Sequence, residues 1–138
     1  RSRSPLGSLA KEFYMIKGIG IDIVEVIRFS KILKRRGQPL LTRVFTPQEL
    51  ESCGTIAYRL AGRFAAKEAF FKALGTGFRG FKWQEVEVKN NPLGAPYFHF
   101  SEKLVAYLDS IGVTKTHLTI SHCKEYAVAQ VIMEGKQE

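Results

Sequence analysis

The chain has 138 residues, of which 45% are hydrophobic, and its formal net charge is +8. This length and composition fit one compact domain and exclude a largely disordered chain. No apolar run approaches the roughly 20 residues that a membrane-spanning helix needs, so we expect no membrane partner. The basic balance predicts an anionic partner, which leaves nucleic acid, phosphate ligands and acidic proteins open.

The first 14 residues do not resemble the rest of the chain. They lack the apolar stretch of a signal peptide, and the segment Ser4-Pro5-Leu6-Gly7-Ser8 resembles a cloning-derived leader. We therefore expect a leader over residues 1–14 and a single domain over residues 15–138. The two cysteines, Cys53 and Cys123, form no zinc pattern with the three histidines. This is typical of free thiols in a reducing cytoplasm.

Residues 16–23 alternate as a β-strand does. One face of this strand carries isoleucines, and the other carries Gly18, Gly20 and Asp22. The two glycines leave room for another group to approach the backbone beside Asp22. A carboxylate on such an apolar strand is costly unless it is paired, so Asp22 is a candidate functional residue.

Residues 24–36 predict a helix that ends before Gly37 and Pro39. Its apolar stripe is Val26, Phe29 and Leu33. Another face is strongly basic, and Ile32 lies on it between Arg28 and Arg35. A hydrophobic residue among cations fits an acidic helical protein partner better than nucleic acid, although a generic basic surface remains the alternative.

Two further helices follow. Thr46-Pro47-Gln48-Glu49 is a capping-box pattern that starts a short helix. Residues 56–74 predict a long central helix, on which Glu68 shares a face with two phenylalanines. On this helix Arg59, Arg63 and Lys67 share another line at steps of four, and Lys72 lies one turn beyond Glu68. The segment Gly75-Thr76-Gly77 ends the helix.

The C-terminal half alternates between strands and one helix. We expect strands over 83–89 and 97–100, joined by a turn over 90–96 that contains Gly94 and Pro96, and then a helix over 101–111. Residues 117–121 and 126–133 form a final hairpin. The predicted order, β-α-α-α-β-β-α-β-β, is an α+β domain with a mostly antiparallel sheet packed by helices.

Asp22 and Glu68 together suit Mg²⁺, which takes one or two carboxylates and completes its shell with water and substrate phosphate. The alternatives are that Glu68 pairs with Lys72 and that Asp22 caps the next helix. Arg63, Lys67 and Lys72 are candidates to bind phosphate, and the alternative is a solvated basic helix face.

Two weaker signals also suit phosphate. The loop after Gly75 can present backbone N–H groups to an anion, although it lacks the Walker pattern. His122 follows Ser121 at a strand end, and no nucleophile elbow or third triad member accompanies this pair, so a nucleotide contact fits better than hydrolysis.

Three segments in this order resemble the holo-[acyl-carrier-protein] synthase family, the small bacterial-type branch of the 4′-phosphopantetheinyl transferases. They are Gly18-Ile19-Gly20-Ile21-Asp22-Ile23, the stretch from Leu60 to Gly77 that includes Arg63-Phe64-Ala65-Ala66-Lys67-Glu68-Ala69-Phe70, and Ile120-Ser121-His122 with Tyr126-Ala127-Val128-Ala129. The resemblance covers nearly all of residues 15–134, and the second segment is long and specific.

The resemblance implies a reaction in which a serine of apo-acyl carrier protein attacks the β-phosphate of coenzyme A. The products are holo-acyl carrier protein and adenosine 3′,5′-bisphosphate. Asp22 and Glu68 match the family's magnesium ligands, and Lys72 or Lys67 adds positive charge at the phosphates. The general base stays open between Glu68, Asp22 acting through a metal-bound water, and water alone.

The resemblance also implies binding residues. Arg63 and His122 match positions that contact the 3′-phosphate of coenzyme A, and Arg28 matches a carrier-protein contact, which Ile32 and Arg35 would extend. The remaining expected coenzyme A contacts are Lys67, Lys72, Gly75, Gly94 and Pro96. The resemblance further implies a homotrimer with each active site at a subunit interface. The family's turn often reads Gly-Lys-Pro, whereas this chain has Ala95 in place of the lysine.

Two other functions would explain part of the same pattern. A nucleic-acid-binding domain would place aromatic residues among cations on a sheet face, whereas here the cations are on helices beside carboxylates. A magnesium-dependent hydrolase of nucleotides would use the same two carboxylates. It would leave the basic face around Ile32 without a purpose.

Overall fold

The computed structural model describes residues 13–75 and 80–136. Its elements, in chain order, are β1 (Tyr14–Glu25), α2 (Val26–Arg36), α3 (Gln38–Val44), α4 (Pro47–Cys53), α5 (Ala57–Leu74), the 3₁₀ turn η1 (Trp83–Glu85), β2 (Val86–Asn90), β3 (Pro96–Phe100), α6 (Glu102–Ser110), β4 (Val113–His122) and β5 (Tyr126–Lys136). This confirms the predicted α+β class. Most of the expected leader and the Thr76-Gly77 part of the expected anion loop lie outside the described residues.

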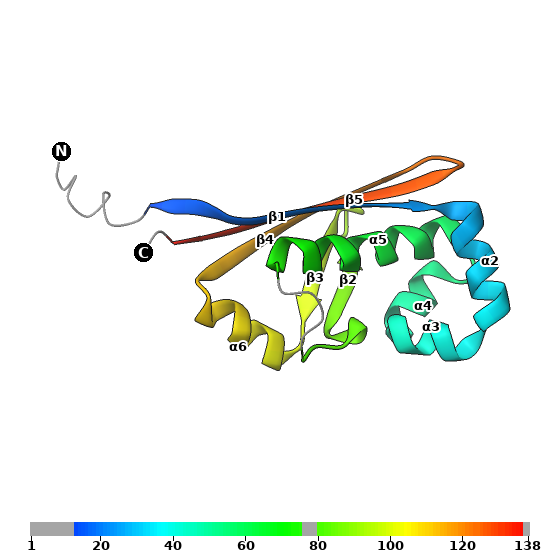
Figure 1. The fold of residues 1–138 in the computed structure, drawn as a ribbon, viewed down its shortest axis with the longest axis horizontal. Coiled ribbons are helices and arrows are strands. Elements are labelled where there is room, and N and C mark those ends of the chain that lie inside the picture. Colours follow the sequence, from blue (N-terminus) through cyan, green and yellow to red (C-terminus); the bar gives the residue numbers. More distant parts are fainter. Residues whose placement is uncertain (1–12, 76–79, 137–138) are drawn as a thin grey trace.

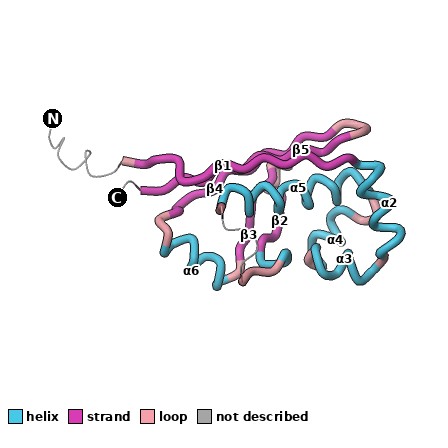
Figure 2. Tube along the Cα trace, viewed as in Figure 1, coloured by secondary structure: helices cyan, strands magenta, loops and turns pink. Residues whose placement is uncertain are grey.

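The strands form two antiparallel sheets. One has three strands in the order β1-β5-β4, and the other is the β2–β3 hairpin. Among the described residues, all helices and the small sheet lie on one side of the three-stranded sheet, and none of these elements covers its other face, which we call the bare face (Figures 1 and 2). In this sheet Ala129 of β5 is the register partner of both Asp22 and Ile120, which places those two residues on opposite edge strands.

Helix α5 packs closely on the covered face because β1 carries no side chain at the two glycines where the helix crosses it. A Cβ on Gly18 would lie 2.2 Å from the carbonyl oxygen of Ala73, and one on Gly20 would lie 1.9 Å from that of Ala69. The group that the sequence predicts beside the glycines is therefore the backbone of α5. This close approach sets the distance between Asp22 on β1 and the side chains of α5.

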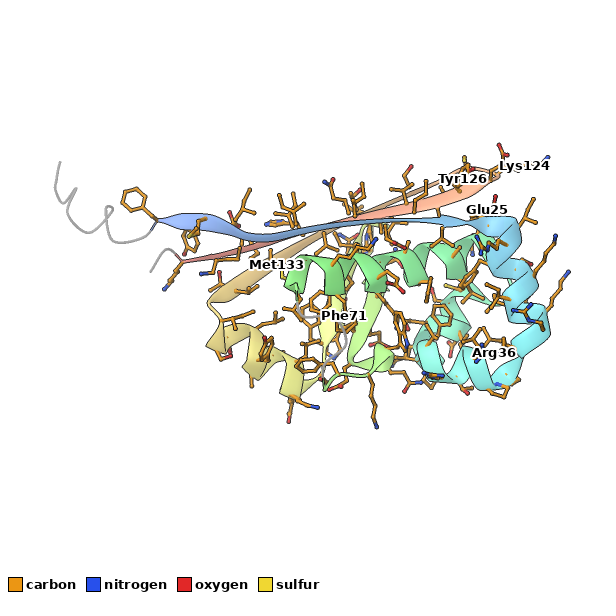
Figure 3. The ribbon with its side chains drawn as sticks, viewed as in Figure 1. Glu25, Arg36, Phe71, Lys124, Tyr126 and Met133 are labelled. Atoms are coloured by element: carbon orange, nitrogen blue, oxygen red, sulfur yellow. The ribbon has the colours of Figure 1, made fainter. Side chains whose placement is uncertain are left out.

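The bare face is hydrophobic along β1. Ile19, Ile21 and Ile23 are 57%, 57% and 61% exposed. Figure 3 shows many side chains projecting from this face, while Met133 and Phe71 lie on the covered side. A contiguous row of exposed isoleucines on a monomer is typical of an interaction surface.

The predicted order lacked one helix, and one strand boundary was wrong. Helix α2 ends at Arg36 as expected, but Pro39 lies in the first turn of a further helix, α3, which the sequence did not predict. The strand expected over 83–89 begins at Val86, since Trp83–Glu85 forms a turn of 3₁₀ helix. Within the described ranges, no helix is both long and apolar enough to cross a membrane.

Candidate active site

A pocket of about 590 Å³, which we call the Asp22 pocket, opens between β1, α2 and α5. Its lining includes Asp22, Glu68 and Lys72 together with Arg28 and Ile32 of α2. The remaining lining residues are Ile23, Val24, Glu25, Phe29, Phe64 and Tyr126. The strand and the two helices thus bring together five of the residues that the sequence singled out.

Asp22 and Lys72 form an ion pair in this pocket. Lys72 Nζ lies 2.9 Å from Asp22 Oδ1 and also donates to the carbonyl of Ile21 at 3.2 Å. The hydrogen bond to Asp22 is the main reason that the pKa of Lys72 is raised. Lys72 is therefore a partly exposed cation that its pair with Asp22 holds in the pocket lining.

Glu68 lies beside this pair without forming an ion pair in the described part of the chain. Burial raises the pKa of its carboxyl, and the nearby Asp22 carboxylate raises it further, against the opposing effect of Lys72. A half-buried carboxyl whose charge is disfavoured by burial and by a neighbouring carboxylate is typical of a cation or proton site. Neither alternative interpretation of these carboxylates holds. Lys72 forms its ion pair with Asp22 and not with Glu68, and Asp22 does not cap α2, which begins after Glu25 without a side-chain cap.

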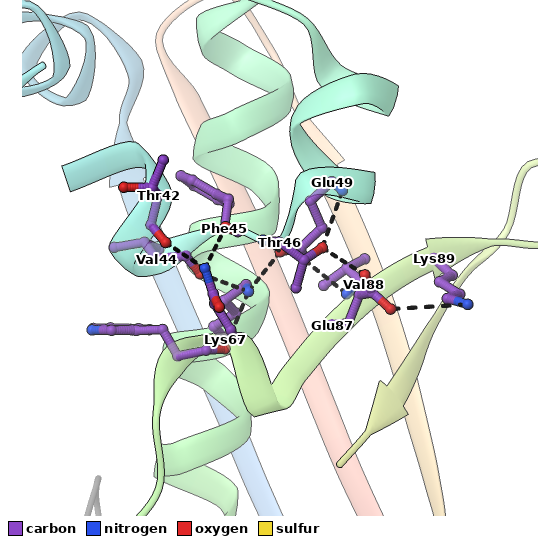
Figure 4. A network of polar contacts seen from close by, with 11 residues as sticks. Thr42, Val44, Phe45, Thr46, Glu49, Lys67, Glu87, Val88 and Lys89 are labelled. Carbon is purple, nitrogen blue, oxygen red and sulfur yellow. Dashed lines mark hydrogen bonds and ion pairs between the residues drawn. The ribbon is translucent and has the colours of Figure 1, made fainter. Parts of the chain in front are cut away.

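Lys67 lies elsewhere, which contradicts the expectation that it binds phosphate. Its side chain is fully buried, with Nζ 2.7 Å from Glu49 Oε1. It also donates to the carbonyls of Val44 at 2.9 Å and Trp83 at 3.2 Å. Burial lowers the pKa of Lys67, although Glu49 opposes this. All three donors of the ammonium group are thus used inside the protein (Figure 4).

A second cavity, the Arg63 pocket, has a volume of about 250 Å³. It contains Arg63 and His122, the two residues expected at the 3′-phosphate of coenzyme A. The His122 ring packs against Tyr58, with ring centroids 4.6 Å apart. The other residues that line the Arg63 pocket are Ser52, Arg59, Gly62, Asn90 and Ile120. Two guanidinium groups and an imidazole around a small cavity suit a phosphate.

The two pockets lie on different sides of α5. They share no lining residue, and Glu68 and Arg63 are five positions apart, which places them roughly 140° apart around a helix. Asp22 and His122 are on the two edge strands, with β5 between them. A single chain therefore presents the carboxylates and the Arg63 pocket in different directions.

The other expected residues are outside both linings. Gly75 is the left-handed C-cap of α5, with φ of 81°. Gly94 lies in the β2–β3 turn and Pro96 begins β3. Arg35 is exposed in the last turn of α2, beyond Arg28 and Ile32, so the basic face of this helix continues away from the Asp22 pocket.

The sequence did not single out several residues that line the pockets. Arg59 lies one helical turn before Arg63, and that spacing was a usable signal. Tyr58 and Asn90 carried no such signal, because their proximity to Arg63 and His122 depends on how β2 and β4 pack against α5.

Comparison with known proteins bears on this geometry. Residues 18–131 match the family model of the 4′-phosphopantetheinyl transferase superfamily. The chain belongs to this superfamily. A holo-[acyl-carrier-protein] synthase of Trichlorobacter lovleyi is 48% identical over 125 residues, which cover 88% of this chain and 99% of that protein. The enzyme class is thus that of the holo-[acyl-carrier-protein] synthases.

Solved structures of transferases in this family have the same fold. The crystal structure of the Neisseria meningitidis holo-[acyl-carrier-protein] synthase matches with a TM-score of 0.81 and 37% identity, covering 86% of this chain and 98% of that one. The Helicobacter pylori synthase, solved in complex with coenzyme A, matches with a TM-score of 0.76 and 32% identity over 83% of this chain and 98% of that one.

Proposed function

We propose that this protein transfers the 4′-phosphopantetheine group of coenzyme A to a serine of apo-acyl carrier protein, with Mg²⁺, and releases adenosine 3′,5′-bisphosphate. The observation that carries the proposal is the Asp22 pocket. It combines Asp22, Glu68 and Lys72 with the basic, partly apolar surface of α2. A site for a diphosphate thus adjoins a surface for an acidic protein.

The donor set of the pocket fits Mg²⁺. Both carboxylates are oxygen donors, and burial together with the Asp22 carboxylate raises the pKa of Glu68, an effect that a bound cation would oppose. No cluster of three or more His, Cys, Asp or Glu occurs in residues 13–75 and 80–136, so substrate oxygens and water would complete the shell. When bound, the ion would offset the charge that develops on the diphosphate.

The residues of the chain divide the remaining tasks. Lys72 would bind the β-phosphate that the serine attacks, because its ammonium is exposed and lies next to the two carboxylates. Arg28 and Ile32 line the same pocket, so a carrier protein docked on α2 would present its serine there. The acidic surface of the carrier would meet Arg28 and Arg35, and an apolar residue would meet Ile32.

The Arg63 pocket would bind the 3′-phosphate through Arg63 and His122, with the β2–β3 turn at Gly94 and Pro96 near the nucleotide. Because this pocket and the Asp22 pocket lie on different sides of α5, coenzyme A would bridge the Asp22 pocket of one subunit and the Arg63 pocket of another. A homotrimer closed through the bare face of the β1-β5-β4 sheet would place them together and bury Ile19, Ile21 and Ile23. We place this assembly in the cytoplasm, and its carrier partner in fatty acid biosynthesis.

Chromatographic detection of adenosine 3′,5′-bisphosphate tests the transfer. We expect its release only when coenzyme A, Mg²⁺ and apo-acyl carrier protein are all present. Release without the carrier protein would favour a hydrolase. If the protein neither releases this product nor binds coenzyme A, the proposed function is wrong.

A further inference from the structure

Asn90, the last residue of β2, connects the Arg63 pocket to the β2–β3 turn. Its Oδ1 accepts a hydrogen bond from the Arg63 guanidinium, and its Nδ2 donates to the carbonyl oxygen of Gly94 at 2.9 Å. One side chain thus connects α5 to the β2–β3 turn. Asn90 has no part in the metal, phosphate and carrier-protein sites of the proposed function.

The chemistry of this contact preserves the charge of Arg63. An amide oxygen orients a guanidinium without neutralising it, whereas a carboxylate would form an ion pair and cancel its charge. None of the ion pairs found in residues 13–75 and 80–136 includes Arg63. Its Nε is buried and has no hydrogen-bond partner in the same part of the chain, so the orientation of this side chain depends on few contacts.

We propose that Asn90 is a positioning residue that sets the specificity for the 3′-phosphate of coenzyme A. It holds Arg63 at the wall of the pocket with its positive charge available, and it fixes the β2–β3 turn to the same group. This inference rests on the proposed function, because it takes coenzyme A as the ligand. It goes beyond that function by assigning the discrimination between coenzyme A and dephospho-coenzyme A to one uncharged side chain.

The geometry makes the effect of two substitutions different. Asn90→Asp keeps an acceptor for Arg63 but adds a negative charge that cancels the guanidinium and repels a phosphate. Asn90→Ala removes both hydrogen bonds and leaves the charge of Arg63 intact but unoriented. Both changes act at the 3′-phosphate end, and neither touches the diphosphate site in the Asp22 pocket.

Titration calorimetry of the full-length protein with coenzyme A and with dephospho-coenzyme A tests this. We expect Asn90→Asp to weaken coenzyme A binding by about tenfold or more, while the affinity for dephospho-coenzyme A changes by less than about twofold. Asn90→Ala should fall between wild type and Asn90→Asp. Gln38→Glu, which adds the same charge at an exposed position of α3, should leave both affinities as in the wild type.

An equal loss of affinity for both ligands in Asn90→Asp would overturn the proposal, because Asn90 would then act only through the turn or the fold. An unchanged preference for coenzyme A would also overturn it. Failure of the proposed function has a different signature, since wild-type protein would then bind neither ligand or would not modify the carrier protein.

Discussion

Lys67 and Glu68 are neighbours in α5, yet their side chains have opposite surroundings. Lys67 is buried against Glu49, and Glu68 faces Asp22 in the pocket. The Lys67 ammonium also binds carbonyls that precede α4 and β2, which fixes how α5 is rotated. This rotation directs Glu68 toward Asp22.

Lys67→Met should destabilise the protein strongly. It leaves the Glu49 carboxylate buried without its charged partner, and breaking such a pair costs about 3–5 kcal/mol of unfolding free energy. Urea denaturation measures this. Lys72→Met is the matched control, because its exposed pair with Asp22 contributes less than about 1 kcal/mol. Equal destabilisation by the two variants would contradict the structural role of Lys67.

Glu68→Gln should stabilise the metal-free protein at neutral pH. Because the pKa of Glu68 is raised in the folded state, the folded protein binds more protons than the unfolded chain between the two pKa values. The free energy of unfolding therefore falls as pH rises between these two pKa values. The amide of the Glu68→Gln variant does not titrate, so this loss is absent. Calorimetry in EDTA should show a higher melting temperature for Glu68→Gln and no change for the exposed Glu51→Gln. A lower melting temperature for Glu68→Gln would count against the assignment.

The same carboxyl predicts how metal binding depends on pH. A protonated Glu68 is a poor ligand, so Mn²⁺ affinity should fall as pH is lowered through the raised pKa, above the ordinary range of glutamate. Electron paramagnetic resonance of free Mn²⁺ measures the affinity without turnover. Asp22→Asn and Glu68→Gln should each lose most of the binding. Wild-type affinity in either variant would remove that residue from the metal site.

Arg35→Glu should weaken carrier-protein docking without affecting coenzyme A. A charge reversal on the basic face of α2 places like charges together, so we expect the KM for the carrier protein to rise about tenfold at low salt. Steady-state kinetics with each substrate varied separates the two effects. Lys136→Glu controls for net charge, because this exposed lysine ends β5, and the C-terminal end of β5 lies far from α2 (Figure 1). An unchanged carrier KM would mean that the partner binds another surface.

Ile21→Lys should yield a folded monomer. The side chain is 57% exposed on the bare face, so a lysine is tolerated in one chain but not at a buried subunit interface. Light scattering gives the mass of the assembly, and circular dichroism checks the fold.

Co-expression of Glu68→Ala with Arg63→Ala should restore activity that neither variant has alone. In a mixed assembly, some shared sites combine an intact Glu68 from one subunit with an intact Arg63 from another. Absence of rescue would contradict a site shared between subunits.

Local patterns predicted the part of the site in which chemistry and periodicity agree. The strand alternation placed Asp22 on the face of the two glycines, and helical spacing placed Lys72 one turn beyond Glu68. The capping box at Thr46 and Glu49 was confirmed as well. These features depend on neighbours within a few residues, so the sequence alone contains them.

The rest depends on packing between distant segments. The helical spacing places Arg63 and Lys67 on one line, but Lys67 is buried against Glu49 of α4, whereas Arg63 lines a pocket and contacts the end of β2. Sequence periodicity does not show which side of a helix other elements will cover. The separation of the two pockets has the same origin, because it follows from the strand order β1-β5-β4 beneath α5.

Intact-mass spectrometry of a purified apo-acyl carrier protein, after incubation with this protein, coenzyme A and Mg²⁺, tests the central claim most directly. The account predicts a mass gain of one phosphopantetheine on the carrier. The gain should disappear with EDTA, with Glu68→Ala, or when the acceptor serine of the carrier is replaced by alanine. An unmodified carrier protein, under conditions in which coenzyme A is bound, would contradict the account.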